Sequence, residues 1–436
     1  MSKRFRYLII AVGIVIFLII APLIIFFISG TKFDLNQRRF VATGLLAFKT
    51  EPKNVEIFLD NEPISKSTTE IRFLVPKNYT LAFKKSGYYD WSKTLLVEPK
   101  KVTWANPKQD KIYLVYKDEN PLSLASDITD FITSQNRLAA LTDNQVLLSD
   151  SWDLATARSF TLPHPATQIQ ASPDFSLFLL TYPKGTGTAF LISILEPASN
   201  KFYDISGFFK TAESLPELAF SANNRLFALA DNILFEIDVR NQTQTQVAKN
   251  VSGFFAQGQN LYYFEILGLK GRLVNWNLDT GEKLALSDNL PLFESAQIIA
   301  NPQKQILLIS DEKLYTLSTS GLKQLAENVK SVGYDSQNGI LGYWAGGELR
   351  YFNGGSEPAL VTRTAESLQQ PKIAANIGYA IYKKNQTLEA LELDLTSEQN
   401  NYQLYAGTLL KKYSTSPNAE QILILDGITL KQFRLY

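Results

Sequence analysis

The sequence predicts an all-β protein with one N-terminal helix, and three observations carry that prediction. An apolar run without any charged residue covers residues 8–28. Short apolar segments divided by turn residues fill residues 43–117, and from Pro121 onward a turn-and-strand unit recurs to the end of the chain. Many short strands at even spacing are typical of sandwiches, barrels and propellers.

Length and charge indicate more than one module. A chain of 436 residues is longer than one ordinary domain. Residues 41–117 hold 13 Lys/Arg and 8 Asp/Glu, a balance of +5, whereas residues 118–436 hold 24 Lys/Arg and 33 Asp/Glu, a balance of −9. Opposite charge balances predict a basic module followed by an acidic one.

Composition excludes several kinds of chemistry. The chain has no cysteine, so disulfides, thiolate metal sites and cysteine nucleophiles are excluded. Its one histidine, His164, stands between Pro163 and Pro165 and is expected to be an exposed loop residue rather than a catalytic or metal-binding one. The absence of cysteine also fits a bacterial envelope protein better than a disulfide-rich secretory lineage.

The run at residues 8–28 is interpreted as a membrane anchor. As a helix its 21 residues would extend roughly 31 Å, about the thickness of a bilayer hydrocarbon core. Lys3, Arg4 and Arg6 precede it, which predicts a cytoplasmic tail at residues 1–7 and an extracytoplasmic remainder. The alternative is a cleaved signal peptide, but the run is long for one and ends without an Ala-x-Ala site. A linker is expected at residues 29–42.

Residues 43–117 are expected to form a small β-sandwich. Candidate strands lie at residues 44–50, 55–59, 70–75, 79–84, 91–97 and 111–116, with turn residues between them. Spacing of about ten residues with turn signals is typical of sandwiches. The basic balance could attract anionic wall polymers or lipid headgroups, although such charges are usually only solvated.

The turn residues of this region carry a family resemblance. Pro52, Asp60, Pro76, Gly87 and Tyr88 stand in the order found in PEGA domains, so the region resembles that family. Residues 53–55 depart from the namesake Pro-Glu-Gly-Ala motif. Asn61 and Asn78 replace the usual glycines, and asparagine tolerates the left-handed conformation expected there. The resemblance implies a spacer or adhesion module of a bacterial or archaeal surface protein, without catalytic residues.

From Pro121 onward a small or polar turn precedes an apolar strand in eight places. The copies lie at residues 133–141, 171–180, 220–229, 256–264, 300–309, 334–343, 374–382 and 415–425. In several copies an apolar strand, an acidic residue and a polar turn follow, as at Asp238, Asp279 and Asp394. Each unit has room for four strands, which predicts a β-propeller over residues 118–436.

The number of blades stays open between seven and eight. The last unit, residues 409–436, has room for three strands, and a propeller often closes by pairing strands from both ends of its chain. Residues 111–116, or those after them, could supply the missing strand. If residues 111–116 belong wholly to the sandwich, seven blades and a partial one are expected.

The turn motif resembles WD40-like propeller repeats of the bacterial TolB-like kind. Ser172, Pro173 and Asp174 match their Ser-Pro-Asp-Gly turn, with Phe175 in place of glycine; residues 416–418 match less well. The Gly-His and Trp-Asp signatures of eukaryotic repeats are absent.

No catalytic, cofactor-binding or metal-binding constellation is recognised, so no enzyme activity is expected. Residues 184–188 have the glycines of a phosphate loop without its spacing, and the glycines at 346–347 and 354–355 are interpreted as turns. Five tryptophans could stack on sugars but are expected to pack in the core: Trp91, Trp104, Trp152, Trp276 and Trp344. Basic runs interleaved with aromatic residues are missing from residues 118–436, so no nucleic-acid partner is expected.

The expected function is binding or scaffolding at the cell envelope. The propeller would recognise a protein or glycan, and residues 8–28 would hold the chain as a single-pass protein of the plasma membrane. Two alternatives remain: an envelope glycan hydrolase with carboxylates converging on the propeller channel, and a TolB-like accessory subunit of an envelope assembly or transport complex.

Overall fold

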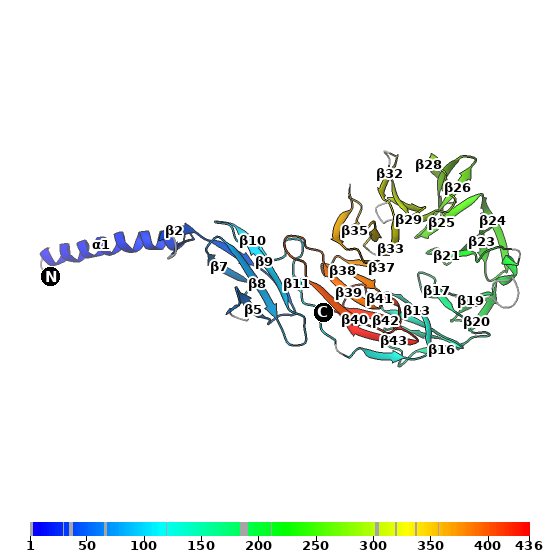
Figure 1. The fold of residues 1–436 in the computed structure, drawn as a ribbon, viewed down its shortest axis with the longest axis horizontal. Coiled ribbons are helices and arrows are strands. Elements are labelled where there is room, and N and C mark those ends of the chain that lie inside the picture. Colours follow the sequence, from blue (N-terminus) through cyan, green and yellow to red (C-terminus); the bar gives the residue numbers. More distant parts are fainter. Residues whose placement is uncertain are drawn as a thin grey trace.

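The computed structural model is a chain of β-sheets preceded by one helix (Figure 1). It describes residues 3–28, 30–34, 38–64, 68–118, 120–183, 191–210, 212–300, 305–318, 321–335, 338–355 and 357–436. The helix, a small β-module and a ring of sheets follow one another along the longest axis of the molecule (Figure 1).

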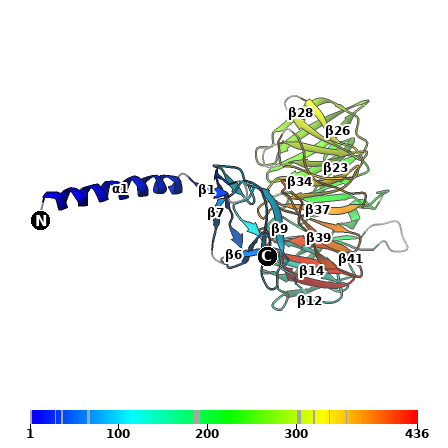
Figure 2. The same cartoon turned by 60° about the vertical axis from the view of Figure 1, so that its left-hand side comes forward.

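Helix α1 (Lys3–Ile28) covers the apolar run and extends away from the rest of the chain (Figures 1 and 2). Apolar side chains along its middle, from Ile10 to Ile20, are exposed. Over the residues that can be assessed, no helix combines the length and the apolarity needed to cross a bilayer. The transmembrane assignment of residues 8–28 is therefore not supported by the structure.

The stretch expected to be a linker, residues 29–42, contains a hairpin. Strands β1 (Thr31–Asp34) and β2 (Arg39–Ala42) pair antiparallel. The Thr43 amide then donates to the Gly30 carbonyl over 2.8 Å, so the two ends of the hairpin are joined. Pattern reading missed this element because strands of four residues give too few positions for an alternation to stand out.

The β-module comprises the short strands between Gly44 and Tyr113. Its strands are β3 (Gly44–Ala47), β4 (Thr50–Glu51), β5 (Glu56–Leu59), β6 (Glu62–Ile64), β7 (Glu70–Leu74), β8 (Asn78–Lys84), β9 (Trp91–Leu96), β10 (Val102–Trp104) and β11 (Ile112–Tyr113). They form sheets in the orders β6-β5-β8-β9, β10-β3-β7 and β11-β4. Buried and exposed residues alternate along β9. The buried residues of the β-module, among them Leu46, Phe83 and Trp91, pack together into one apolar core.

Two turns of the β-module test the expectation about asparagine. Asp60 and Asn61 join β5 to β6 with φ of 51° and 68°, so both adopt the left-handed conformation. Asn78 does not, because it begins strand β8 and its backbone is extended. Gly87 has a φ of +81°.

The remaining chain forms eight four-stranded antiparallel sheets within the described residues, arranged in a ring (Figure 1). We number these blades 1 to 8 and call the first strand of each its inner strand. Blade 1 contains β13 (Ile128–Ser134), β14 (Arg137–Thr142), β15 (Gln145–Ser149) and β16 (Arg158–Thr161), and blade 2 contains β17 (Gln168–Ala171), β18 (Phe178–Thr181), β19 (Ile192–Glu196) and β20 (Lys201–Asp204). Blade 3 contains β21 (Glu217–Phe220), β22 (Leu226–Ala230), β23 (Ile233–Asp238) and β24 (Thr243–Lys249), and blade 4 contains β25 (Val251–Gln257), β26 (Asn260–Leu267), β27 (Lys270–Asn277) and β28 (Lys283–Pro291). A short 3₁₀ turn, η1 (Ser206–Phe209), links blades 2 and 3.

Blades 5 to 8 repeat this pattern. Blade 5 contains β29 (Gln297–Ala300), β30 (Ile306–Ser310), β31 (Lys313–Ser318) and β32 (Gly321–Ala326), and blade 6 contains β33 (Val329–Asp335), β34 (Ile340–Ala345), β35 (Glu348–Phe352) and β36 (Ala359–Arg363). Blade 7 contains β37 (Leu368–Ala374), β38 (Tyr379–Lys384), β39 (Thr387–Glu392) and β40 (Asn401–Ala406). Blade 8 contains β41 (Leu410–Thr415), β42 (Gln421–Asp426) and β43 (Thr429–Arg434) together with β12 (Leu122–Ala125). Of the two blade numbers expected, eight is observed.

Blade 8 closes the ring with strands from both ends of the propeller sequence. Strand β12 pairs antiparallel with β43 and gives the sheet order β12-β43-β42-β41. The closing strand thus comes from the residues after 111–116. Residues 112–113 form β11 and pair with β4 in the β-module, so they cannot also complete the propeller.

The second strand of each blade explains why the repeat was visible as an apolar run. Strand β34, for example, is buried at all six positions, and Ile422 to Leu425 are buried in β42. A blade packs against a neighbour on each face, so both faces of its central strands are covered and alternation disappears.

The recurring turns have a common backbone geometry. The residue in the left-handed conformation is Gln135, Phe175, Asn224, Gly258, Gly339, Gly378 or Ala419, one in each turn after an inner strand except that of blade 5, whose residues 301–304 lie outside the described part of the chain. Phe175, which replaces the expected glycine, has a φ of 61°. Its turn is held because Asp174 Oδ1 accepts hydrogen bonds from Ser172 Oγ (2.7 Å) and from the Ser176 amide (3.0 Å).

The β-module packs against blade 7 through a buried polar interface (Figure 2). Lys93 on β9 places its ammonium 2.5 Å from Asp394 and 3.3 Å from Glu392, and its side chain is 0% exposed. Trp91 Nε1 donates to Glu392 Oε1 over 3.1 Å. The basic and acidic modules predicted from the charge distribution therefore meet through paired opposite charges.

Further contacts extend this interface along the chain. The Tyr379 hydroxyl donates to the Tyr113 carbonyl (2.8 Å), and the Gln109 amide donates to the Ala375 carbonyl (2.6 Å). Val115 belongs to the same apolar cluster as residues of blades 7 and 8. The β-module is thus fixed against the propeller over several elements.

Candidate binding site in the propeller channel

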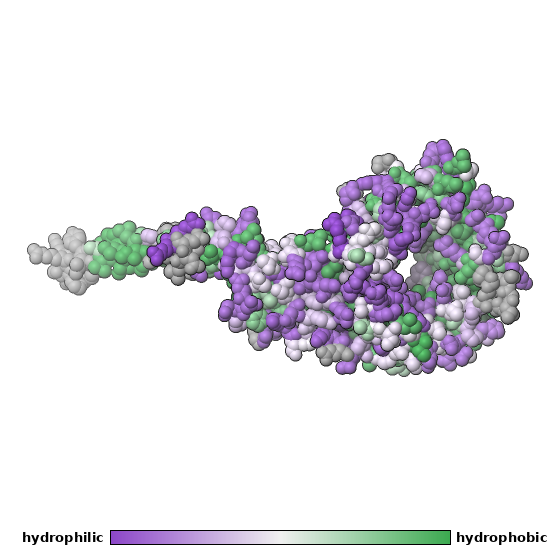
Figure 3. Space-filling view, viewed as in Figure 1, coloured by the Kyte–Doolittle hydropathy of each residue, from purple (hydrophilic) through white to green (hydrophobic). Residues whose placement is uncertain are grey.

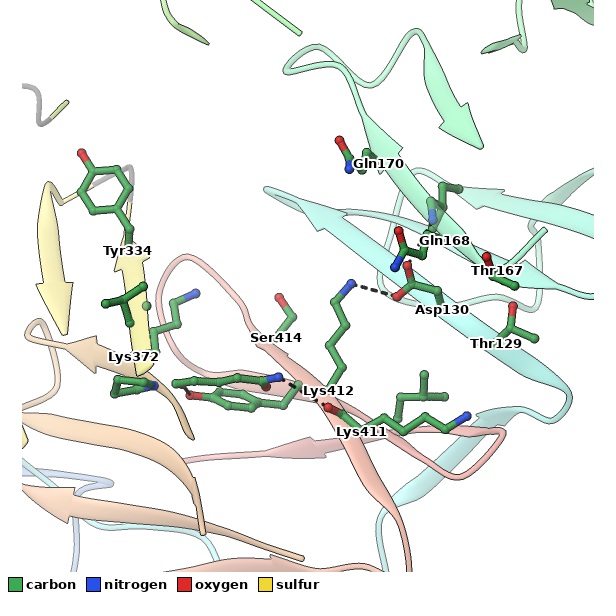
Figure 4. A pocket seen from close by; sticks show the side chains of 17 residues that line it. Thr129, Asp130, Thr167, Gln168, Gln170, Tyr334, Lys372, Lys411, Lys412 and Ser414 are labelled. Atoms are coloured by element: carbon green, nitrogen blue, oxygen red, sulfur yellow. Dashed lines mark hydrogen bonds and ion pairs between the residues drawn. The ribbon is translucent and has the colours of Figure 1, made fainter. Parts of the chain in front are cut away.

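The inner strands leave a cavity of about 640 Å³ at the centre of the ring, which Figure 3 shows as a hollow (Figures 3 and 4). Residues of blades 1, 2, 6, 7 and 8 line it: Thr129, Asp130, Thr167, Gln168, Ile169, Gln170, Val332, Gly333, Tyr334, Gln370, Pro371, Lys372, Lys411, Lys412, Tyr413, Ser414 and Leu425. Amide, hydroxyl and ammonium groups dominate, so the cavity suits a polar ligand.

One ion pair in the cavity joins the first and last blades. Lys412 Nζ on β41 lies 2.9 Å from Asp130 Oδ1 on β13 and donates to the Phe131 carbonyl over 2.7 Å. The other oxygen of Asp130 accepts the Ile169 amide of blade 2 (3.1 Å). Lys412 and Asp130 therefore hold three consecutive blades together at the point where the ring closes.

Close approach of blades 6 and 7 forms another part of the wall. A Cβ on Gly333 of β33 would lie 2.0 Å from the Pro371 carbonyl oxygen, so only glycine fits there. The Ser331 hydroxyl accepts the Gln370 amide over 2.8 Å. This contact positions the irregular part of β37.

A β-bulge directs Lys372 toward the cavity. The register of β37 on β38 shifts between Gln369 and Lys372, and Gln370 has a φ of 50°. Bulges re-aim side chains and are frequent beside functional sites. Figure 4 shows the Lys372 side chain beside Tyr334 and facing the channel (Figure 4).

The environment of Lys372 differs from that of Lys412. Among the described residues, the Lys372 ammonium has no hydrogen bond or ion pair, although it is half-buried. Burial lowers the pKa of the Lys372 ammonium, and the charge of Asp335 opposes that shift only in part. Lys372 also lines a second cavity of about 240 Å³ together with Asp335 and Trp152, so it lies between two hollows.

The residues that the sequence offered as functional candidates are not among those that line this cavity. His164 is exposed at a bend, as expected, with its ring 6.2 Å from that of Tyr182. Residues 184–188 fall outside the described residues. The glycines at 346–347 form the turn between β34 and β35, and those at 354–355 lie between β35 and β36, so both are turns as interpreted.

The tryptophans differ in burial. Trp91, Trp152 and Trp344 are buried, as expected, and Trp276 is half-buried under Arg225 and Lys283. Trp104 of the β-module is 49% exposed, so the expectation of core packing is wrong for that residue.

The paired carboxylates considered for a hydrolase do not meet in the main cavity. Asp130 is the one carboxylate among its lining residues. In the described part of the chain, no group of three or more His, Asp or Glu side chains is placed to hold a metal ion.

The lysines of the channel were not singled out from the sequence. Lys372, Lys411 and Lys412 belong to two inner strands, and Asp130 belongs to a third, 282 positions before Lys412. One local signal existed, because Gln370 and Pro371 interrupt a strand pattern and proline is tolerated at bulges.

Comparison with known families and structures agrees with this architecture. Residues 43–111 match the PEGA domain family. No curated protein sequence matches the chain. The fold is similar to a crystal structure described as the eukaryotic initiation factor, with a TM-score of 0.52 and 13% identity, over 72% of this chain and 86% of that one.

Two further similar structures are named as propellers. One is the Dos1 propeller, with a TM-score of 0.46 and 9% identity, over 72% of this chain and 94% of that one. The other is the β-propeller domain of the Trilobed protease from Pyrococcus furiosus, with a TM-score of 0.40 and 12% identity, over 64% and 98%. At such identities a likeness concerns the fold alone. Residues 43–111 form a PEGA domain, and the ring of eight four-stranded sheets in the described residues after it is a β-propeller.

Proposed function

We propose that this protein is an extracytoplasmic binding or scaffold protein of the cell envelope, and that the propeller channel is its recognition site. The observation that carries the proposal is the cavity of about 640 Å³ lined by polar groups from five of the blades. Large concave sites with a few converging polar groups are the usual places for ligand recognition.

A binding role accounts for the cavity better than a hydrolase does. Glycoside hydrolysis ordinarily uses two carboxyl groups across the scissile bond. The cavity offers Asp130, and both oxygens of that carboxylate are already engaged by Lys412 and the Ile169 amide. The hydrolase alternative therefore lacks its second group at this site.

The interface between the modules supports a scaffold role. Lys93, Glu392 and Asp394 are buried, and the contacts reach from Tyr89 to Val115 on the β-module side. A fixed interface holds the channel in one orientation relative to the β-module. A TolB-like accessory subunit would use the same arrangement, and co-purification with a membrane complex would favour it over a free surface receptor.

Attachment to the plasma membrane by residues 8–28 belongs to the proposal. Its support is the absence of charge in that run, with Lys3, Arg4 and Arg6 before it. Protease added to intact cells, or to spheroplasts where a wall shields the surface, should digest the propeller. Full protection of the propeller would contradict the proposed topology.

A capture experiment tests the channel as the recognition site. The full chain in detergent is immobilised and exposed to solubilised envelope fractions, and the bound material is compared between variants. Gln170→Trp fills the channel and should abolish capture, whereas Gln246→Trp, on the outermost strand of blade 3, should leave capture intact. Equal capture by both variants would remove the channel from the proposal, and no capture by the wild-type chain would refute a binding role.

A further inference from the structure

We infer that the channel binds an acidic peptide segment, whose carboxylates pair with Lys372 and Lys411 while its backbone hydrogen-bonds to the open edge of an inner strand. The inference rests on the channel being the recognition site and adds the chemistry of the ligand. It is carried by the charges, the strand edges and the polar side chains of the cavity.

The charge of the cavity is opposite to that of the propeller around it. Three lysines and one aspartate line the cavity, whereas residues 118–436 hold 24 Lys/Arg and 33 Asp/Glu. The acidic exterior repels an acidic chain and the cationic channel attracts it. Such an arrangement concentrates binding in the channel and disfavours binding elsewhere on the propeller.

Two of the three lysines are available to a ligand. Lys412 is bound to Asp130 and the Phe131 carbonyl. Lys411 is exposed, and neither its ammonium nor that of Lys372 has a partner among the described residues. A half-buried ammonium without an ion pair is unfavourable, so a ligand carboxylate would supply the interaction that the described residues do not.

The inner strands can receive a peptide backbone. Strands β37 and β41 each end the strand order of their sheets, so within the described sheets another strand pairs with only one edge of each. On the other edge of β37, the Gln370 amide donates to Ser331, and the remaining groups face the cavity side of the blade. An extended peptide binds to such edges through main-chain hydrogen bonds, and neighbouring side chains select its sequence. Gln168 and Gln170 offer further donors and acceptors around the same cavity, whereas Gln370 Nε2 already donates to the Lys411 carbonyl over 3.5 Å.

A peptide fits these walls better than an acidic glycan. Sugar rings are commonly recognised by stacking on accessible aromatic faces. Two aromatic residues line the cavity, Tyr334 and Tyr413. Tyr413 is buried, and its hydroxyl donates to the Ile381 carbonyl over 2.9 Å, so its ring belongs to the wall between blades 7 and 8. The half-buried Tyr334 is then the one ring of this lining that a sugar could stack on, whereas three lysines line the same cavity.

Fluorescence anisotropy with defined probes tests the inference. The full chain is held in nanodiscs of neutral lipid and titrated with fluorescein-labelled octaglutamate, with octaglutamine as the uncharged control. We expect binding of octaglutamate alone, and weaker binding as salt rises because exposed charges are screened. Lys372→Gln and Lys411→Gln should each weaken binding by about tenfold, the scale of one charge pair.

Matched variants separate the channel from the general surface. Lys313→Gln removes an exposed lysine on β31, outside the cavity, and should change affinity less than about twofold. Lys372→Arg keeps the charge and should retain most of the binding. Thermal unfolding of each variant checks that the variant folds. If a substitution at Lys372 disturbs the channel, Lys411→Gln still tests the inference, because Lys411 is exposed.

Three results would overturn the inference. The first is equal affinity of the Lys372→Gln/Lys411→Gln double variant and the wild-type chain, and the second is tighter binding of polygalacturonate than of octaglutamate. The third is no binding of octaglutamate while envelope capture stays sensitive to Gln170→Trp, in which case the channel would remain a recognition site for another ligand class.

Discussion

Lys93, at the interface between the modules, and Lys372, in the channel, differ in whether their ammonium groups form ion pairs. At the interface between the modules, Lys93 is fully buried between Asp394 and Glu392, at 2.5 and 3.3 Å. In the channel, the described residues leave Lys372 without an ion pair. The first lysine completes a contact within the chain, whereas the second offers an unsatisfied charge at a cavity.

The difference teaches how to separate structural charges from functional ones in this fold. A buried ion pair gives little net stability, but removing one partner leaves the other charge without compensation. A cation without a partner is a cost to the folded state, and such costs are often found at sites that bind ligands.

Replacing Lys93 should have the largest effect. Lys93→Met leaves Glu392 and Asp394 buried without their cation, and we expect a loss of about 3–5 kcal/mol in the free energy of unfolding, measured with urea. Lys330→Met removes an exposed pair with Glu312 and should cost less than about 1 kcal/mol. Combining Lys93→Met with Glu392→Gln and Asp394→Asn should recover much of the loss. Similar unfolding curves for Lys93→Met and Lys330→Met would contradict the structural role.

Gly333 tests the contact that positions the bulge of Lys372. Gly333→Ala places a Cβ 2.0 Å from the Pro371 carbonyl oxygen, which the backbone must move to avoid. We expect a loss of about 1–3 kcal/mol, as for other overpacked sites. Gly207→Ala is the control, because its Cβ would meet nothing within 4 Å. An unchanged stability for Gly333→Ala would show that blades 6 and 7 are not held as closely as described.

Acid should weaken the module interface. Burial would raise the pKa of the Asp394 carboxyl, but hydrogen bonds from Lys93 and Thr396 outweigh it and lower that pKa. A lowered folded pKa means that the contribution is complete above the unfolded value of about 3.9 and is lost as pH falls through the folded value. The stability difference between wild type and Asp394→Asn, measured by urea unfolding, should therefore shrink below about pH 4. A difference that is constant from pH 7 to pH 2 would contradict this pKa assignment.

Lys372 should show the smallest effect on stability, and in the opposite direction. Lys372→Met removes a half-buried charge without a partner, so stability should stay the same or rise by up to about 1 kcal/mol. Lys412→Met breaks the pair with Asp130 and should lower stability by about 1 kcal/mol. Both values come from urea unfolding. A clear loss of stability for Lys372→Met would place that lysine with Lys93, as a structural residue.

Local sequence was enough to predict the β-module and the repeats. The turns at Asp60–Asn61 and around Gly87, and the left-handed residue in seven recurring turns, depend on neighbouring residues and leave a signal in composition. The apolar second strands were visible because burial on both faces demands several consecutive apolar residues. The hairpin at Thr31–Asp34 and Arg39–Ala42 was missed because such short strands carry almost no periodic signal.

The pairing of charges depends on contacts between residues that are far apart in the sequence. Lys93 and Asp394 are separated by 301 positions, and Lys412 and Asp130 by 282, so no local pattern could connect them. The same holds for the eighth blade, whose closing strand β12 lies more than 300 positions from its partner β43.

An all-β chain of two modules with opposite charge could be predicted from the sequence, because strands, turns and charge balance are local properties. Burial and partnership depend on which distant strands become neighbours when the ring closes. For that reason the tertiary structure alone distinguished the structural Lys93 from Lys372, and located the cationic channel inside an acidic propeller.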